Sequence, residues 1–253
     1  MVSVLGKASK LHDDAVTMNF IEAGGAGCKA CPLAGNGCYA EHVAKRRGNI
    51  AAGMEARRNK YGLVGLARLA YWELGGLIAA EQPPVWFRWS SLGAWPTPHM
   101  VTPEFWEAVD DVHQLCEDND IPVHLPIQGL AKASWVRDNV RDSVIVRGSC
   151  LPIQTAHDIG TTPADTHEVF RRSQSPRSVV VGRKGMPYRE RLQLCETVKE
   201  HAEKLGCTAM ICPATEASMR TRLGEYAKTG EEKCGHCTTC SELTTDIVIY
   251  PFH

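Results

Sequence analysis

Short runs of β-branched and aromatic residues recur along the whole chain, and longer segments with helical periodicity lie between them. Runs of this kind, bounded by glycine, proline and polar residues, predict β-strands. The predicted strands are Thr17–Glu22, Val85–Trp89, Pro122–Leu125, Ser143–Val146, Ser178–Val181, Thr208–Ile211 and Asp246–Tyr250. We therefore expect a protein in which strands and helices alternate.

Helices are expected in most of the intervals between these strands. Pro103 and Pro187 each stand where a helical pattern begins, a position that favours proline, and Gly206 is placed to cap the second of these helices. The predicted helices are Glu41–Lys60, Leu63–Ala80, Thr102–Asp118 and Pro187–Leu205, with short helices after Lys132 and Asp165.

The alternation of strand and helix is typical of a parallel sheet with covered faces. The predicted fold class is α/β, with a complete or partial (β/α) barrel as its architecture. A doubly wound open sheet is the alternative, and periodicity does not decide between the two. The length of 253 residues suits one barrel-like domain over 1–253. Within it we expect an N-terminal cysteine loop at 27–40 and a metal-binding C-terminal segment at 212–253.

Side chains suited to binding follow the predicted strands. In parallel α/β folds, ligands bind where the carboxyl ends of strands meet the loops that follow. Residues in these positions are Cys28, Cys31, Cys38, Ser90, Ser91, Gln128, Lys132, Arg147, Cys150, Arg183, Lys184, Cys212 and His253. We expect them to gather on one rim. The candidates for binding a cofactor or substrate, apart from metal, are Arg88, Ser90, Ser91, Lys132, Arg147 and Cys150.

The cysteine content adds chemistry to this picture. The chain has 11 cysteines, several CxxC spacings and no N-terminal stretch that resembles an export signal. This combination favours thiolates that bind metal in a reducing cytoplasm over a secreted disulfide framework. No run of about 18 apolar residues predicts a transmembrane helix. The formal net charge of −1 gives no argument of its own for nucleic acid or a membrane.

The first cysteine cluster is Cys28-x2-Cys31-x6-Cys38. Two cysteines separated by two residues can chelate one metal centre through a tight turn, and Pro32 follows Cys31 as proline does in bacterial ferredoxins. The pattern favours a [4Fe–4S] cluster held by three protein thiolates, with one iron open to a cofactor or substrate. A zinc knuckle and buried free cysteines are the alternatives.

The second cluster is Cys234-x2-Cys237-x2-Cys240, the spacing of the first three ligands in the bacterial ferredoxin run. Cys212 precedes a proline at the end of a predicted strand and is the candidate for the fourth thiolate. A site closed by four thiolates would be structural or would transfer electrons. Zinc fits the same residues, either with four cysteines or with three cysteines and His236 or His253.

Other residues allow two interpretations each. Cys116, Cys195 and Cys207 lie in or beside predicted helices and are interpreted as buried hydrophobic residues. Basic residues at helical spacing lie in the first predicted helix, where they would track a phosphate backbone or form a solvated helix face. They are Lys45, Arg46, Arg47, Arg57, Arg58 and Lys60. The tryptophans around Arg88 would stack on a base or pack in the core; they are Trp86, Trp89 and Trp95.

Several of these motifs resemble those of phage proteins without an assigned chemistry. The stretches CPLAGNGCYAEHVAKRRG, FRWSSLGAW, TAMICPA and CGHCTTC, with the terminal FH, are similar to the gene-product-88-like family. CYAEHVAKR is also similar to the gene-product-37/68 proteins, which resemble radical S-adenosylmethionine (SAM) enzymes of the spore-photoproduct-lyase kind. Some relatives carry a cysteine in the place of His42, which makes His42 an additional candidate ligand.

The resemblance implies an iron–sulfur enzyme on a radical-SAM-like barrel. It implies one or two [4Fe–4S] clusters, SAM as cofactor, and nucleic acid or a nucleotide as substrate in a phage modification pathway. The expected location is the cytoplasm, that of the host cell if a phage encodes the chain. Zinc remains the alternative at the C-terminal site. The oligomeric state is not indicated.

Two further hypotheses remain open. Cys234, Cys237, Cys240 and His253 are similar to the zinc site of tRNA-guanine transglycosylases, which would indicate a zinc-containing, DNA-modifying enzyme. The other is a non-catalytic iron–sulfur or zinc module that binds nucleic acid or a protein partner.

Overall fold

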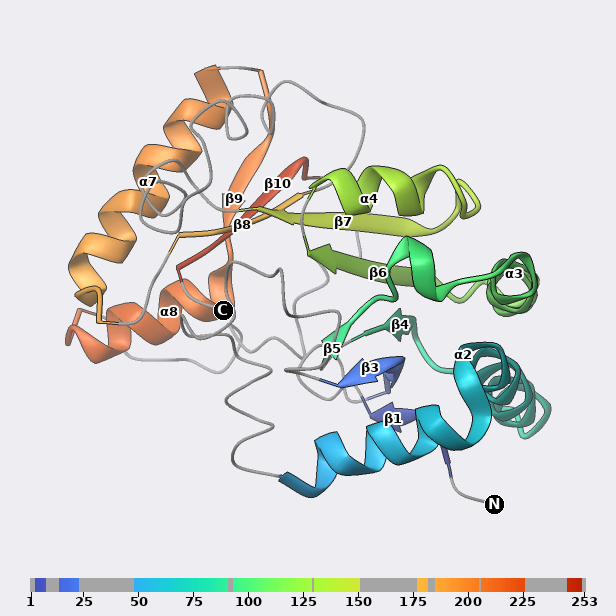
Figure 1. Ribbon diagram of the computed structural model, residues 1–253. Coiled ribbons are helices and arrows are strands. Elements are labelled where there is room, and N and C mark those ends of the chain that lie inside the picture. Colours follow the sequence, from blue (N-terminus) through green and yellow to red (C-terminus); the bar gives the residue numbers. More distant parts are fainter. Residues whose placement is uncertain are drawn as a thin grey trace. The chain divides into compact units, whose positions relative to one another are not determined.

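The computed structural model describes residues 3–7, 14–22, 48–90, 93–128, 130–150, 177–181, 185–204, 206–225 and 245–251 (Figure 1). The chain divides into two compact units, Met1–Val146 and Arg147–His253. Each unit contains parallel strands and covering helices, so the α/β class is confirmed. The barrel and the single domain over 1–253 stay predictions.

The first unit is built on parallel strands. β2 (Val16–Met18), β4 (Phe87–Trp89) and β6 (Val123–Gln128) pair in that order and in parallel. β1 (Gly6–Lys7) pairs with β2 in the antiparallel direction. β3 (Ile21–Glu22) and β5 (Gly93–Ala94) form a separate antiparallel ladder.

Helices α2 (Gly48–Ala79), α3 (Pro103–Glu117) and α4 (Leu130–Arg137) belong to the same unit, with a short 3-10 helix at Pro98–Met100. Gly62 has a φ of 66° and a ψ of 178°, which interrupts α2 where the sequence predicts a boundary between two helices. Glycine permits this conformation because it has no Cβ.

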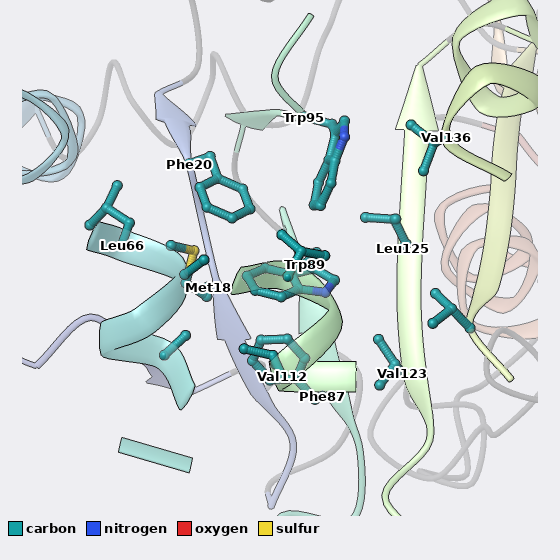
Figure 2. Packing of buried hydrophobic residues seen from close by; sticks show 14 of the residues in the cluster. Met18, Phe20, Leu66, Phe87, Trp89, Trp95, Val112, Val123, Leu125 and Val136 are labelled. Atoms are coloured by element: carbon teal, nitrogen blue, oxygen red, sulfur yellow. The ribbon is translucent and has the colours of Figure 1, made fainter. Parts of the chain in front are cut away.

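The three helices contribute to one hydrophobic core (Figure 2). The strands supply alternate residues to this core, because successive side chains of a strand point to opposite faces. The buried strand residues in it include Met18, Phe87, Trp89, Val123, Leu125 and Ile127. Aromatic rings fill its centre, with Phe20 stacked on Trp89 at 5.0 Å and edge-on to Trp95 at 5.2 Å.

The N-terminal segment is fixed to α2 by one carboxylate. Glu73 accepts hydrogen bonds from the backbone amides of Val4 and Leu5, at 2.7 and 3.0 Å, and from the hydroxyl of Ser3 at 2.8 Å. Backbone amides are strong donors to a carboxylate. Glu73 thereby holds the segment that leads into β1.

The second unit also has a parallel sheet. β7 (Ile145–Cys150) crosses the boundary between the units, and its last residues pair with β8 (Arg177–Val180). β10 (Ile247–Tyr250) pairs with β8 on one side and with β9 (Ala209–Ile211) on the other, all in parallel. α7 (Tyr188–Lys204) packs Cys195, Val198 and Ala202 into a core with strands β9 and β10. α8 (Pro213–Arg222) follows β9 directly.

Every predicted strand overlaps an observed one. The run Thr17–Glu22 divides into β2 and β3, while β6 and β7 extend beyond their predicted ends. The two-residue strands β1 and β5 and the helix α8 were not predicted. The helix expected after Asp165 lies outside the described residues.

A buried histidine makes the stability of the first unit depend on pH. Trp89 Nε1 donates a hydrogen bond to His113 Nε2 at 2.9 Å, so this nitrogen accepts and the ring is neutral. Burial, with a smaller effect of Arg141, lowers the pKa of His113 to about 3, and Asp110 opposes this shift. The neutral ring is therefore stabilising above about pH 6.5, and this contribution is lost as the pH falls from 6.5 toward 3.

We predict that His113→Gln, whose amide oxygen still accepts from Trp89, flattens the acid side of the stability curve. Below pH 6.5 the wild-type protein should lose about 1.4 kcal/mol of unfolding free energy per pH unit relative to the variant. Urea unfolding of both proteins between pH 7.5 and 5 measures the difference. Parallel curves would show that His113 does not control this dependence.

Candidate functional site

The parallel strands of the first unit direct several predicted site residues to one edge. Because β2, β4 and β6 run in the same direction, their carboxyl ends lie on the same side of the sheet. The chain leaves β2 on this side and passes through β3 into residues 23–47, the segment that carries the first cysteine cluster. The predicted ligands in it are Cys28, Cys31, Cys38 and His42, and all four lie outside the described residues.

Ser90 follows β4 at this edge in an unusual conformation. Its φ is 56°, in the left-handed region, and its amide donates to the carbonyl of Met18 at 2.7 Å. Ser90 as a residue is 5% exposed, and its hydroxyl has no hydrogen-bond partner. Backbone strain and an unsatisfied buried hydroxyl both cost free energy. Ser90 thus stands directly after the carboxyl end of β4, whereas Ser91 lies outside the described residues.

Lys132 lies in the first turn of α4, which starts two residues after β6. Its ammonium group donates to the carbonyl of Trp95 at 2.5 Å. This bond ties α4 to the segment after β5. The indole N–H of Trp95 is buried and has no hydrogen-bond partner. Lys132 therefore stabilises the same edge at which Ser90 stands.

A polar row crosses the face of the sheet that is turned away from the hydrophobic core. In the strand register Thr17 on β2 is opposite Arg88 on β4, and Arg88 is opposite His124 on β6. Thr17 and His124 are 4% and 3% exposed, and Arg88 is half-buried. The edge of the Trp86 ring meets His124, with 5.8 Å between the ring centroids. Three neighbouring strands thus present a hydroxyl, a guanidinium and an imidazole side by side.

The sequence predicts only Arg88 of this row. Its flanking residues alternate as expected, with Phe87 and Trp89 in the core and Arg88 on the opposite face. The same alternation in Val123–Gln128 places His124 opposite to Val123 and Leu125, a signal that would have identified it. Thr17 is recognised only because the strand register pairs it with Arg88, and the sequence alone does not reveal that register.

The stacking hypothesis for the three tryptophans is wrong. Trp86, Trp89 and Trp95 are buried, and Trp89 and Trp95 belong to the aromatic centre of the core. They therefore pack the interior and offer no open ring to a base. Among the described residues, Trp72 on α2 is an exposed tryptophan.

Cys212 stands at the carboxyl end of β9 in the second unit. It is the N-cap residue of α8 and is 5% exposed. Its amide donates to the carbonyl of Ile249 on β10 at 2.7 Å, and its carbonyl accepts from the amide of Glu216 at 2.9 Å. These two bonds fix the backbone of Cys212 at the point where β9 ends and α8 begins.

The end of α8 and the residues that follow it, up to Glu225, contact the first residues of α7. Arg222 at the end of α8 donates to the hydroxyl of Tyr188, the first residue of α7, at 2.6 Å. Glu225 forms an ion pair with Arg189 at 3.5 Å. Because α7 follows β8 and precedes β9, its first turn lies on the carboxyl side of the sheet. The chain therefore enters residues 226–244 on the side where Cys212 stands.

Two other predicted residues of this unit lie in β7. Arg147 was expected in the loop after the strand, but it lies within β7 and is 1% exposed. This correction arises because the strand continues through Gly148 to Cys150, which is its last residue. The remaining predicted ligands, Cys234, His236, Cys237, Cys240 and His253, lie outside the described residues.

The cysteines interpreted as hydrophobic are buried, as predicted. Cys116 lies in the core of the first unit, and Cys195 and Cys207 lie in that of the second. Burial raises the pKa of Cys116 to about 12. It also raises that of Cys195 to about 12, with smaller effects from Glu196, Glu216 and Cys212. Both remain neutral thiols and are poor metal ligands.

Within the described residues, no group of three or more histidine, cysteine, aspartate or glutamate side chains is arranged to hold a metal ion. No described helix has both the length and the apolar character needed to cross a membrane. No protein-family description, curated protein or solved structure matches this sequence.

We predict that Ser90→Gly leaves the protein equally stable or stabilises it by up to about 1 kcal/mol. Glycine adopts a positive φ without strain, and the change also removes a buried unsatisfied hydroxyl. Glu81→Gly is the matched control, because Glu81 has a φ of 57° at the end of α2. Thermal unfolding measures both. A clear loss of stability in Ser90→Gly alone would show that the hydroxyl stabilises the fold.

Proposed function

We propose that this chain is an iron–sulfur enzyme of the radical-SAM kind. Cys28, Cys31 and Cys38 would hold a [4Fe–4S] cluster with one iron free of protein ligands, and His42 is a further candidate ligand. The observation that carries the proposal is the departure of this cysteine segment from the carboxyl edge of parallel strands. Ligands bind at that edge in α/β folds.

The covered face of the first unit supports a barrel-like architecture. α2, α3 and α4 all pack on one face of the sheet, and the other face carries the row Thr17–Arg88–His124. A doubly wound sheet would be covered by helices on both faces, and its strands would be apolar on both. Helices on the outer face alone are typical of a complete or partial (β/α) barrel, because its inner face closes on itself.

A second metal centre would use Cys212 with Cys234, Cys237 and Cys240. Cys212 is the candidate for the fourth thiolate because it stands between the carboxyl end of β9 and the start of α8 and precedes a proline. The nine residues that follow Glu225, up to and including Cys234, span at most about 30 Å. α8 has 10 residues and is about 15 Å long, so the chain can return to Cys212. His236 and His253 would complete a zinc site instead.

The cluster, when bound, would supply one electron and an open coordination position, the chemistry with which radical-SAM enzymes activate their cofactor. The residues of this chain would position the other groups. Ser90 and Lys132 lie at the carboxyl edge of the sheet in the first unit, where a cofactor would lie. Arg88 lies one residue before the carboxyl end of β4. Arg147 and Cys150 are further candidates on β7.

The biological setting follows from the resemblance to phage proteins. The substrate would be nucleic acid or a nucleotide in a phage modification pathway, and the reaction would take place in the host cytoplasm. Thiolate ligands and iron–sulfur clusters persist in that reducing compartment.

We predict that the protein purified without oxygen is brown and contains about four iron and four sulfide ions per cluster. Iron, sulfide and zinc analysis measures this content. Cys31→Ser should abolish the N-terminal cluster, and Cys212→Ser should lower the content of the second centre only. With a reductant, the wild-type protein should cleave SAM, and Cys31→Ser should not.

Cys195→Ser is the matched control, because Cys195 is a buried neutral thiol in the same unit as Cys212. It should leave the metal content unchanged. A colourless protein that holds stoichiometric zinc and no iron would contradict the proposal, and so would a cluster that persists in Cys31→Ser.

A further inference from the structure

Four of the six tryptophans of the protein lie ring against ring in the first unit. The ring centroids of Trp89 and Trp95 are 5.8 Å apart, those of Trp95 and Trp106 are 6.1 Å apart, and those of Trp106 and Trp135 are 5.3 Å apart. Rings at these separations are in contact, and an electron passes most rapidly between groups in contact. We propose that these four residues, the tryptophan path, carry single oxidising equivalents from the carboxyl edge of the sheet to the protein surface.

The inner end of the path lies toward the carboxyl edge. Trp95 directly follows β5, and it lies on the side of Trp89 toward which the strand arrows point (Figure 2). The ammonium group of Lys132, in the first turn of α4, donates to the carbonyl of Trp95 at 2.5 Å. Trp95 is therefore the member of the path that an oxidant formed at this edge reaches.

The outer end of the path lies at the surface. Trp95 is 0% exposed, whereas Trp106 on α3 and Trp135 on α4 are half-buried. A cation costs less free energy where water reaches it than in the core. In addition, α3 contains acidic residues and no lysine or arginine, which favours a positive charge on Trp106. An oxidising equivalent on Trp95 therefore moves outward.

The hydrogen bonds of the two inner rings keep the charge mobile. The indole N–H of Trp95 is buried and has no hydrogen-bond partner, so an oxidised Trp95 has no base to take its proton. The ring stays a cation and accepts an electron from Trp106. Trp89 donates to Nε2 of His113, but burial disfavours a positive charge on that imidazole. Neither inner ring therefore traps the charge by losing its proton.

The transfer is a series of one-electron steps in which no bond between heavy atoms forms or breaks. An oxygen-derived oxidant at the edge gains one electron from Trp95, Trp106 reduces Trp95, and Trp135 reduces Trp106. Oxidised Trp135 releases its indole proton to water. A small thiol then returns one electron and one proton to Trp135 and becomes a thiyl radical. The path protects the edge from oxidation, a role that rests on the proposed function, because a reduced cluster generates such oxidants with oxygen.

The test attaches a ruthenium photo-oxidant to the full chain through His99→azidophenylalanine. Position 99 is exposed and lies four residues after Trp95. A light pulse makes the complex take one electron from Trp95, and transient absorption measures how long the oxidised indole and the reduced complex persist. With the path intact, the charge moves away to Trp135 and the pair is long-lived. Trp106→Phe keeps an aromatic ring for packing but interrupts the path, so this lifetime should fall severalfold.

Trp72→Phe is the matched control, because Trp72 is an exposed tryptophan on α2 whose ring contacts Tyr71. It should leave the lifetime unchanged. Thermal unfolding shows whether each variant folds, and if Trp106→Phe does not, Trp135→Phe shortens the path at its half-buried end instead. A lifetime that stays the same in the folded path variant would overturn the inference.

The two proposals fail separately. The photo-oxidant takes the place of the cluster in this experiment, so the result does not depend on which metal the cysteines bind. A zinc protein with a long-lived pair that Trp106→Phe shortens would contradict the proposed iron–sulfur function alone.

Discussion

The first unit depends on the alternation of side chains along three short parallel strands. Residues of one parity, Phe87 and Trp89 among them, pack against the helices and form the aromatic core. Residues of the other parity form the row that contains Arg88. A shift of one residue in the register would bury Arg88 among aromatic rings, at a cost of several kcal/mol. The packing that stabilises the unit therefore also fixes the position of its polar groups.

The same constraint fixes the base of the candidate site in the first unit. The base consists of strand residues whose neighbours are set by backbone pairing, and Ser90 and Lys132 are held at its rim by bonds to Met18 and Trp95. The cysteines come from the long connections that follow the strands. This division is usual in α/β enzymes, where a scaffold positions loops that carry the chemistry.

The sequence predicted the strands well because their apolar runs are short and distinct, and proline marked the starts of α3 and α7. It did not predict α8, because the Cys212-Pro213 pair was interpreted as a ligand motif and the helix behind it is polar. Arg147 was placed after its strand because Gly148 interrupts the apolar run, although the backbone remains extended. His124 was given no role, because a single histidine in an apolar run indicates no function until its neighbours on the adjacent strands are known. Register is a long-range property, and local patterns do not encode it.

The position of β10 has a consequence for the order of events during synthesis. In the described part of the chain, β9 pairs only with β10, which is inserted between β8 and β9. While Ile247–Tyr250 remain inside the ribosome, β9 has no partner strand, and the amide of Cys212 lacks the carbonyl of Ile249 that holds it. The nascent chain thus exposes Cys212 and an incomplete sheet until Ile247–Tyr250 have left the ribosome. The assembly of a metal centre that uses Cys212 would then have to wait for β10, with 34 residues between Cys212 and Ile247 in the sequence.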